Sequence, residues 1–294
     1  MSIEKIYDYF RSYDKETYQV FACGDDTPSE QDIEAFESEF NIKLPEDFKE
    51  FTMSPLGGLY MEVREEIWPM AQEYEVAPFW EFCRGIMVYG ISSEVPEYLD
   101  LRANTRAFHE SGLSDCIPFF SVIGDGEQIF CFDREGKILL FDGYEMHDVE
   151  GDFESFLLGQ IAELEERKDK KIRYSVGEAY AFRAYAYHQL VQLFAKRYNA
   201  STAASDPGVV MRDENATNAQ LYEPARRGTV AEAYGLIESD LKMAMETLKD
   251  LDQNNSRNHL RYSTVCGIAA RVALCKSDWV AAETYAKEAI ANAN

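Results

Sequence analysis

The chain has 294 residues, about twice the usual domain size, so two domains are expected. Residues 1–170, the acidic half, contain 14 Lys and Arg against 39 Asp and Glu, whereas residues 171–294, the neutral half, contain 15 against 14. The net charge of −24 excludes an ordinary surface for nucleic acid or anionic lipid, since phosphate binding requires Lys and Arg. Basic proteins remain possible partners, and solubility is the alternative explanation of the charge.

The cysteines and the first residues indicate the compartment. The six cysteines are scattered, with no C-x-x-C pair and no His at zinc-ligand spacing, so we expect reduced thiols and neither metal nor cofactor. The opening MSIEKIYDYFRSYDKE is charged throughout and lacks the apolar core of a secretory signal. No apolar run approaches the roughly 18 residues of a membrane span. A cytoplasmic protein without membrane insertion is therefore expected.

Two short helices are predicted near the start of the acidic half. Ser29 and Asp32 have the spacing of a capping box, and the helix after them should turn one apolar face inward. That face consists of Ile33, Phe36 and Phe40. A second helix is expected to begin at Pro45 and to be stopped by Gly57 and Gly58.

Five runs of apolar, β-branched and aromatic residues follow, and they predict one antiparallel sheet. The runs are GLYMEV, GIMVYGI, CIPFFSVI, EQIFCF and KILLF. The last two should form a hairpin through residues 133–136, where Gly136 can take a positive φ. A helix ending at Gly112 and a closing helix capped by Asp152 complete an α+β fold in which helices pack on the sheet.

These pieces, in this order, resemble the SUKH superfamily, which includes the Smi and Knr cell-wall synthesis regulators. The resemblance covers nearly all of residues 1–165. It rests on Glu37, Leu44, Pro45, Phe48, Phe51, Gly57 and Gly58, followed by Pro118, Gly124, Asp125, Gly126 and Phe132. It implies a non-catalytic binding fold, because bacterial members are often immunity proteins that block a toxin, frequently a nuclease, while fungal relatives are regulatory. An acidic blocker complements a basic surface, so a basic protein toxin is the expected partner.

One segment of the acidic half has the composition of an interface. The stretch EVREEIWPMAQEYEVAPFWEF mixes aromatic residues with glutamates, and aromatic anchors inside an acidic rim are typical of an interaction hot spot. The alternative is a set of core aromatics beside exposed glutamates. The residues predicted to bind the partner are Glu62, Glu65, Glu66, Trp68, Glu73, Glu75, Phe79 and Trp80.

No catalytic or metal-ligating residues are predicted. His109 and His147, with Cys83 and Cys116, have the residue types of a nucleophilic Cys–His system. Neither cysteine, however, is surrounded by a local signature such as a strained nucleophile elbow. We therefore expect a binding protein and not an enzyme.

The neutral half is predicted to be an all-α, tetratricopeptide-like segment. Small residues alternate with aromatics in GEAYAFRAYAYHQLVQLFAKRY, so neighbouring helices can approach closely. Thr229 and Glu232 form a capping-box pair at the start of a second helix, after an irregular connection over residues 199–228. Two further helices should turn at residues 276–278, with Trp279 at a packing position.

Three separated segments of the neutral half resemble the SusD/RagB family of outer-membrane glycan-binding lipoproteins. They are GEAYAFRAYAYHQLVQLFAKRYN, RGTVAEAYGLIESDLKMAMETL and ARVALCKSDWVAAETYAKEAI, within about residues 174–294. Family members are several times longer and carry most sugar contacts elsewhere. Glycan binding needs an exposed aromatic platform, whereas Trp279 and His188 are both expected to be packed. An oligosaccharide is thus a partner only under an alternative interpretation, a glycan-binding nutrient-uptake fragment fused to an unrelated domain.

The charged run EERKDKKIR joins the halves without a Gly/Ser-rich or Pro-rich linker, and it can continue as one long helix. The two resemblances imply opposite compartments, the cytoplasm and the cell surface. We therefore interpret the chain as a chimera, natural or artificial, of a SUKH domain over residues 1–170 and a partial SusD/RagB-like segment over residues 171–294. Its function is expected to reside in the first of these.

Overall fold

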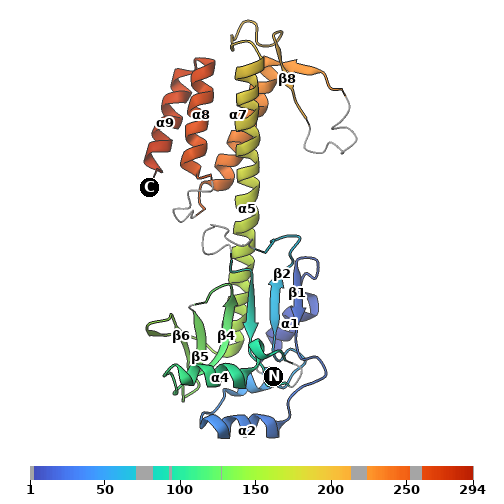
Figure 1. Cartoon of the computed structure of the whole chain (residues 1–294), viewed down its shortest axis with the longest axis vertical. Coiled ribbons are helices and arrows are strands. Elements are labelled where there is room, and N and C mark those ends of the chain that lie inside the picture. The colour runs from blue at the N-terminus through green and yellow to red at the C-terminus, as the bar shows by residue number, and fades with distance from the viewer. Residues whose placement is uncertain are drawn as a thin grey trace. The chain divides into compact units, whose positions relative to one another are not determined.

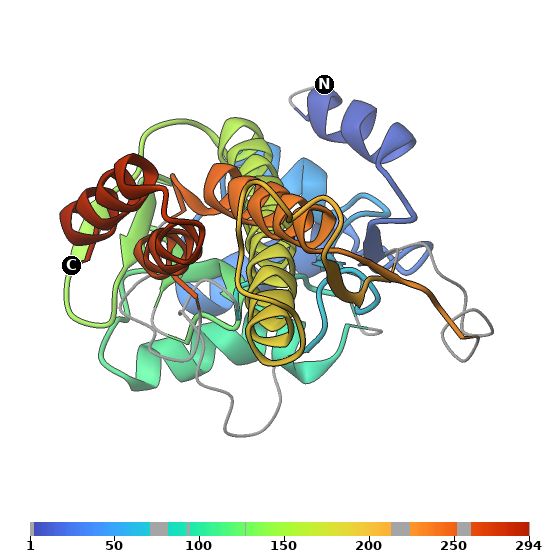
Figure 2. The same cartoon turned by 90° about the horizontal axis from the view of Figure 1, so that it is seen from above.

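A computed structural model describes residues 3–70, 82–92, 95–126, 128–212, 224–251 and 260–293. Figures 1 and 2 show the chain from two directions. The described residues form two compact units, which divide after Asp169. We call them the first unit and the second unit.

The described part of the first unit contains one seven-stranded antiparallel sheet whose strands neighbour one another in chain order (Figure 1). The strands are β1 (Tyr18–Phe21), β2 (Tyr60–Val63), β3 (Gly85–Val88), β4 (Ile117–Ile123), β5 (Ile129–Phe132), β6 (Ile138–Phe141) and β7 (Met146–Asp148). Strands β2 to β6 correspond to the five predicted runs. The outermost strands β1 and β7 were not predicted, because three or four residues at a sheet edge carry little apolar pattern.

Helices pack with this sheet, so the predicted α+β architecture is confirmed. They are α1 (Glu4–Ser12), α2 (Glu30–Phe40), α3 (Glu46–Thr52), the 3-10 helix η2 (Glu97–Leu99), α4 (Leu101–Glu110) and the beginning of α5 (Phe153–Phe194). The predicted capping box starts α2: the Ser29 hydroxyl accepts from the Asp32 backbone N–H, and the Asp32 carboxylate accepts from the Ser29 backbone N–H at 2.8 Å. The predicted hairpin joins β5 to β6, with Gly136 at φ 81°.

Aromatic rings fill the core of the first unit. Phe119 of β4 stacks on Phe132 of β5, with ring centroids 3.9 Å apart. Phe48 of α3 contacts both Phe132 and Phe153, with centroid distances of 5.0 and 5.1 Å. Asp47 adds a polar link, because its carboxylate accepts the backbone N–H of Phe153 at 2.8 Å. These contacts hold α3 and the first turn of α5 against the sheet.

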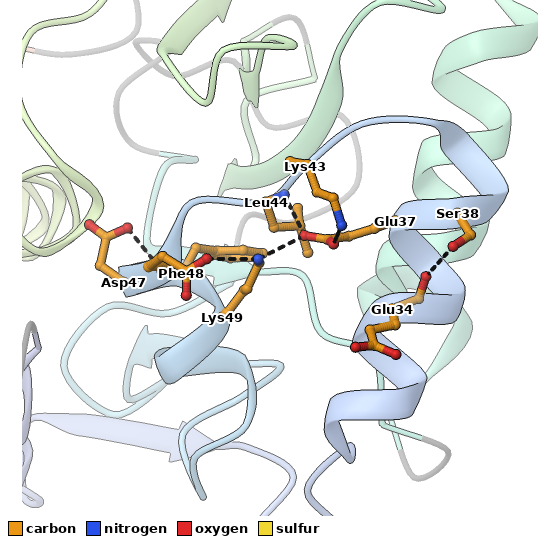
Figure 3. Close-up of polar contacts among 9 residues, drawn as sticks. Glu34, Glu37, Ser38, Lys43, Leu44, Asp47, Phe48 and Lys49 are labelled. Atoms are coloured by element: carbon orange, nitrogen blue, oxygen red, sulfur yellow. Dashed lines mark hydrogen bonds and ion pairs between the residues drawn. The ribbon is translucent and has the colours of Figure 1, made fainter.

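A buried carboxylate ties α2 to the segment that leads into α3 (Figure 3). Glu37 accepts the backbone N–H of Leu44 at 2.9 Å and forms ion pairs with Lys49 at 3.0 Å and with Lys43. Burial alone would raise the pKa of Glu37, but the bonds from Lys43, Leu44 and Lys49 together hold it below its usual value. Glu37 is therefore an ionised structural residue.

The α5 helix runs without interruption from Phe153 to Phe194, and the division between the units falls inside it. Its buried residues form two groups, from Phe153 to Leu164 and from Tyr174 to Val191, with none between them. Within the described chain, the main buried core of the first unit draws its members only from residues 3–164. The charged run is thus helical, and each group of buried residues on α5 serves its own unit.

The second unit is mainly helical. Besides the end of α5 it contains β8 (Pro207–Val210), β9 (Arg227–Thr229), α7 (Val230–Leu248), α8 (Tyr262–Lys276) and α9 (Trp279–Ala291). In both views α8 and α9 lie side by side (Figures 1 and 2). The Thr229–Glu232 capping box is confirmed, with hydrogen bonds of 3.1 and 2.7 Å. The antiparallel β8–β9 pair corrects the expectation of an irregular connection, since the short strands pair only through tertiary contact.

Close packing joins α5 to α7. A Cβ atom on Gly177 would lie 2.6 Å from Cγ of Leu248, so only glycine allows this approach without rearrangement. Ala181 and Ala184 on the same stripe of α5 are fully buried. Two other small residues of the predicted stretch, Ala179 and Ala186, lie on the exposed face of α5 instead.

A bidentate ion pair reinforces the same helix pair. The Arg183 guanidinium donates from Nε and Nη2 to the two carboxylate oxygens of Asp240, both at 2.7 Å. Asp240 is buried, whereas the Arg183 side chain keeps 27% of its exposure. Removal of one partner therefore leaves a largely buried charge uncompensated.

We predict that Asp240→Ala lowers the local free energy of opening of α7 by about 3 kcal/mol. This value is at the low end of the usual cost of breaking a buried ion pair, because Arg183 is partly solvated. Hydrogen exchange of the α7 amides in the full chain measures this change. The double variant Arg183→Met, Asp240→Leu should recover most of the loss, since it removes both charges. Equal protection in Asp240→Ala and the original chain would show that the pair does not stabilise the unit.

Candidate protein-binding groove

The described members of the predicted partner-binding set do not gather on one surface. Trp68 is 1% exposed and belongs to the core, so it is not a surface anchor. Burial of so large an apolar ring stabilises the folded state, because it removes apolar surface from water. Glu62 is also buried, in an ion pair with Arg84. Glu65 and Glu66 are exposed in the turn after β2. The remaining predicted residues, Glu73, Glu75, Phe79 and Trp80, lie outside the described residues.

A groove of about 460 Å³ lies where β1, β2 and residues 95–99 meet. Phe21, Tyr60 and Tyr98 line it with their rings, and Phe21 and Tyr98 are 61% and 58% exposed. The ring centroids of Phe21 and Tyr60 are 6.2 Å apart, and those of Tyr60 and Tyr98 are 6.4 Å apart. Adjacent exposed aromatic rings of this kind mark interaction sites more often than ordinary surface.

The strand register explains why these side chains meet. Phe21 of β1 stands directly opposite Tyr60 of β2, and Gln19 stands directly opposite Glu62. Because side chains two residues apart on a strand share a face, all four project from one side of the sheet. Tyr98 joins them from η2.

The Glu62 carboxylate lines the groove and is held by a dense set of donors. Its Oε2 accepts from Arg84 Nη2 at 2.6 Å, from Arg84 Nε at 3.1 Å and from the Tyr60 hydroxyl at 3.0 Å, while the Gln19 amide donates to Oε1. Arg84 also donates to the backbone carbonyl of Trp68 at 3.1 Å. Two residues of the predicted contact set thus have structural roles: Glu62 pairs with Arg84, and the Trp68 carbonyl accepts a bond from the same guanidinium.

Two ionisable groups that line the groove, Tyr60 and Cys23, have raised pKa values. Burial, and then the charge of Glu62, raise the pKa of Tyr60 to about 12, so its hydroxyl stays a donor. Burial, and then Asp26, raise the pKa of the Cys23 thiol, which also lines the groove. The exposed carboxylate of Glu97 lies between the lining residues Pro96 and Tyr98, and that of Asp25 lies two residues after the lining residue Cys23. The groove is therefore aromatic, with negative charge around it.

Both histidines considered for a Cys–His system contact other groups in the structure. His109 Nε2 bonds the backbone carbonyl of Cys116 at 2.8 Å rather than its thiol, and His147 bonds Asp142 at 2.7 Å. Cys116 lies beside Cys131, whose hydrogen bond holds the pKa of Cys116 below its usual value. No group of three or more His, Cys, Asp or Glu side chains is placed to hold a metal ion in the described ranges. Across the same residues, every helix is too short or too polar to span a membrane.

The second unit offers one exposed tryptophan. Trp279 is 66% exposed, which corrects its expected packing position, because α9 buries Ala282 instead. His188 is buried, as expected, and burial lowers its pKa, with Arg271 adding to the effect.

Comparison with known proteins finds two family matches, one after the other along the chain. Residues 27–159 match the model of the SMI1 / KNR4 family (SUKH-1). Residues 155–274 match the SusD-like_3 model, described as starch-binding associating with outer membrane. Both family resemblances are thus confirmed, each for its own part, and the two matches meet within α5. No curated protein matches the chain at a significant level.

Solved structures resemble part of the chain. A SusD superfamily protein from Bacteroides thetaiotaomicron is 25% identical, with a TM-score of 0.37 over 42% of this chain and 25% of its own. A SusD-like carbohydrate binding protein from Bacteroides vulgatus is 19% identical, with a TM-score of 0.35 over 42% and 25%. A SusD superfamily protein from the latter organism is 25% identical, with a TM-score of 0.38 over 47% and 30%. The chain spans between a quarter and a third of the length of these proteins.

We predict that Glu62→Ala lowers the free energy of unfolding of the first unit by about 3–5 kcal/mol, because it leaves Arg84 buried without its counter-ion. Chemical denaturation of the full chain, followed by hydrogen exchange at β2 and β3, measures the loss. Glu66→Ala is the matched control, and its exposed side chain should cost less than about 0.5 kcal/mol. Equal stability of the two variants would contradict a structural role for the ion pair.

Proposed function

We propose that the chain is a cytoplasmic, non-catalytic binding protein that neutralises a basic protein toxin through its first unit. The observation that carries the proposal is the groove lined by Phe21, Tyr60 and Tyr98. It belongs to residues 1–170, which contain 39 acidic residues and only 14 basic ones. The match of residues 27–159 to the SMI1 / KNR4 family supports assignment of the binding role to this unit.

The charge and the groove contribute to different steps of binding. A strongly acidic surface attracts a basic partner over long range and raises the association rate, an effect that salt screens. Aromatic side chains in a groove supply desolvated contact area, which mainly lowers the dissociation rate. Together, the acidic surface and the groove would give fast association with a basic toxin and slow dissociation from it.

We expect the full chain to bind and inhibit the toxin encoded beside its gene. The association rate should fall about tenfold or more between 50 and 500 mM salt, as expected for electrostatic steering. Tyr98→Ala should raise the dissociation rate about tenfold, as loss of an interface aromatic does. Surface plasmon resonance resolves the two rates.

The matched control is Tyr144→Ala, because Tyr144 is 88% exposed in the same unit but does not line the groove. This variant should keep both rates. Binding that is absent, or that is indifferent to salt, would contradict the proposed function.

A second candidate function is glycan binding by the second unit. The exposed ring of Trp279 favours it, because sugar rings stack on exposed aromatic side chains. The SusD-like match over residues 155–274 favours it as well. Under this alternative, isothermal titration of the full chain with maltoheptaose should give measurable heat that Trp279→Ala abolishes. Val280→Ala, next to it and 78% exposed, is the control. Absence of heat with starch-like and host oligosaccharides would reject this candidate.

A further inference from the structure

We infer that the groove of the first unit receives an arginine side chain of its protein partner. This inference rests on the proposed function and names the chemistry of the contact. The groove combines three aromatic rings with surrounding negative charge, two features that a guanidinium group uses for recognition.

The rings form walls rather than a flat patch. The Phe21 and Tyr60 rings are inclined by 56°, and the Tyr60 and Tyr98 rings by 77°. The Phe21 and Tyr98 rings remain 61% and 58% exposed, and exposed aromatic faces attract cations through their negative quadrupole. A volume of about 460 Å³ admits a guanidinium together with its methylene stem.

The polar atoms of the groove favour a donor over an acceptor. Oε2 of Glu62 accepts three hydrogen bonds, whereas Oε1 accepts the amide of Gln19. A carboxylate offers about four acceptor positions, and these four bonds occupy them, so Glu62 orients the groove and does not itself receive the guanidinium. The Tyr60 hydroxyl donates to Glu62 and can itself accept.

Charge around the groove selects a cation against an anion. Its lining contains no Lys or Arg within the described ranges, and the Arg84 guanidinium below it is already engaged with Glu62 and the Trp68 carbonyl. Asp25 and Glu97 are exposed and lie within two residues of the lining residues Cys23 and Pro96, so their carboxylates add negative potential near the groove. Arginine is favoured over lysine because a planar guanidinium both stacks on rings and donates to carboxylates, while it is less strongly hydrated than an ammonium.

Nuclear magnetic resonance titration of the full chain with capped Gly-Arg-Gly peptide tests the inference. Resonances of Phe21, Tyr60 and Tyr98 should shift on binding. The matching citrulline peptide, which has the same shape without the charge, should bind about fivefold more weakly or worse. Phe21→Ala and Tyr98→Ala should each weaken arginine binding by about fivefold, while Tyr144→Ala leaves it unchanged.

Equal binding of the citrulline peptide, tighter binding of a capped Gly-Leu-Gly peptide, or shifts confined to other residues would overturn the inference. So would absence of any shift at tens of millimolar peptide. If the toxin still binds in a salt-dependent manner while the arginine peptide does not, the arginine inference fails and the proposed function stands. If the peptide binds but the toxin does not, the groove chemistry is supported and the toxin assignment fails.

Discussion

The buried ion pair between Glu62 and Arg84 is the interaction on which the candidate site depends. Two charges beneath a sheet face lose their hydration, and such a pair persists only when its remaining donors and acceptors are satisfied. Gln19, Tyr60 and the carbonyl of Trp68 satisfy them. These bonds link β1 and β2 to Arg84, which directly precedes β3, and through it to Trp68, and they fix Tyr60 and Glu62 in the lining of the groove.

Burial separates the structural side chains of the first unit from those available for binding. Carboxylates that are buried, such as Glu37 and Glu62, have intramolecular partners and stabilise the fold. Aromatic rings divide likewise: Phe119 and Phe132 stack in the core, whereas Phe21 and Tyr98 remain more than half exposed beside the groove. An exposed aromatic cluster on a strongly acidic unit is costly to leave unpartnered, which is the physical basis for assigning binding to this place.

Local signals in the sequence predicted local structure well. The capping boxes at Ser29 and Thr229 and the turn at Gly136 are each determined by residues within a few positions, and all three are confirmed. The groove was missed because it depends on register: Phe21 meets Tyr60 only through the pairing of β1 with β2. Trp68 was misplaced for a related reason, since a turn carries no periodicity that tells an inward from an outward ring. The available signal was in LYMEV, where the apolar residues Leu59, Met61 and Val63 alternate with Tyr60 and Glu62.

Hydrogen–deuterium exchange of the full chain, with and without the toxin proposed as its partner, shows whether the groove is the binding surface. If the groove binds the toxin, backbone amides of β1, β2 and residues 95–99, where the groove lies, should exchange more slowly in its presence. Protection confined to α7, α8 and α9, with exchange at β1 and β2 unchanged, would contradict it.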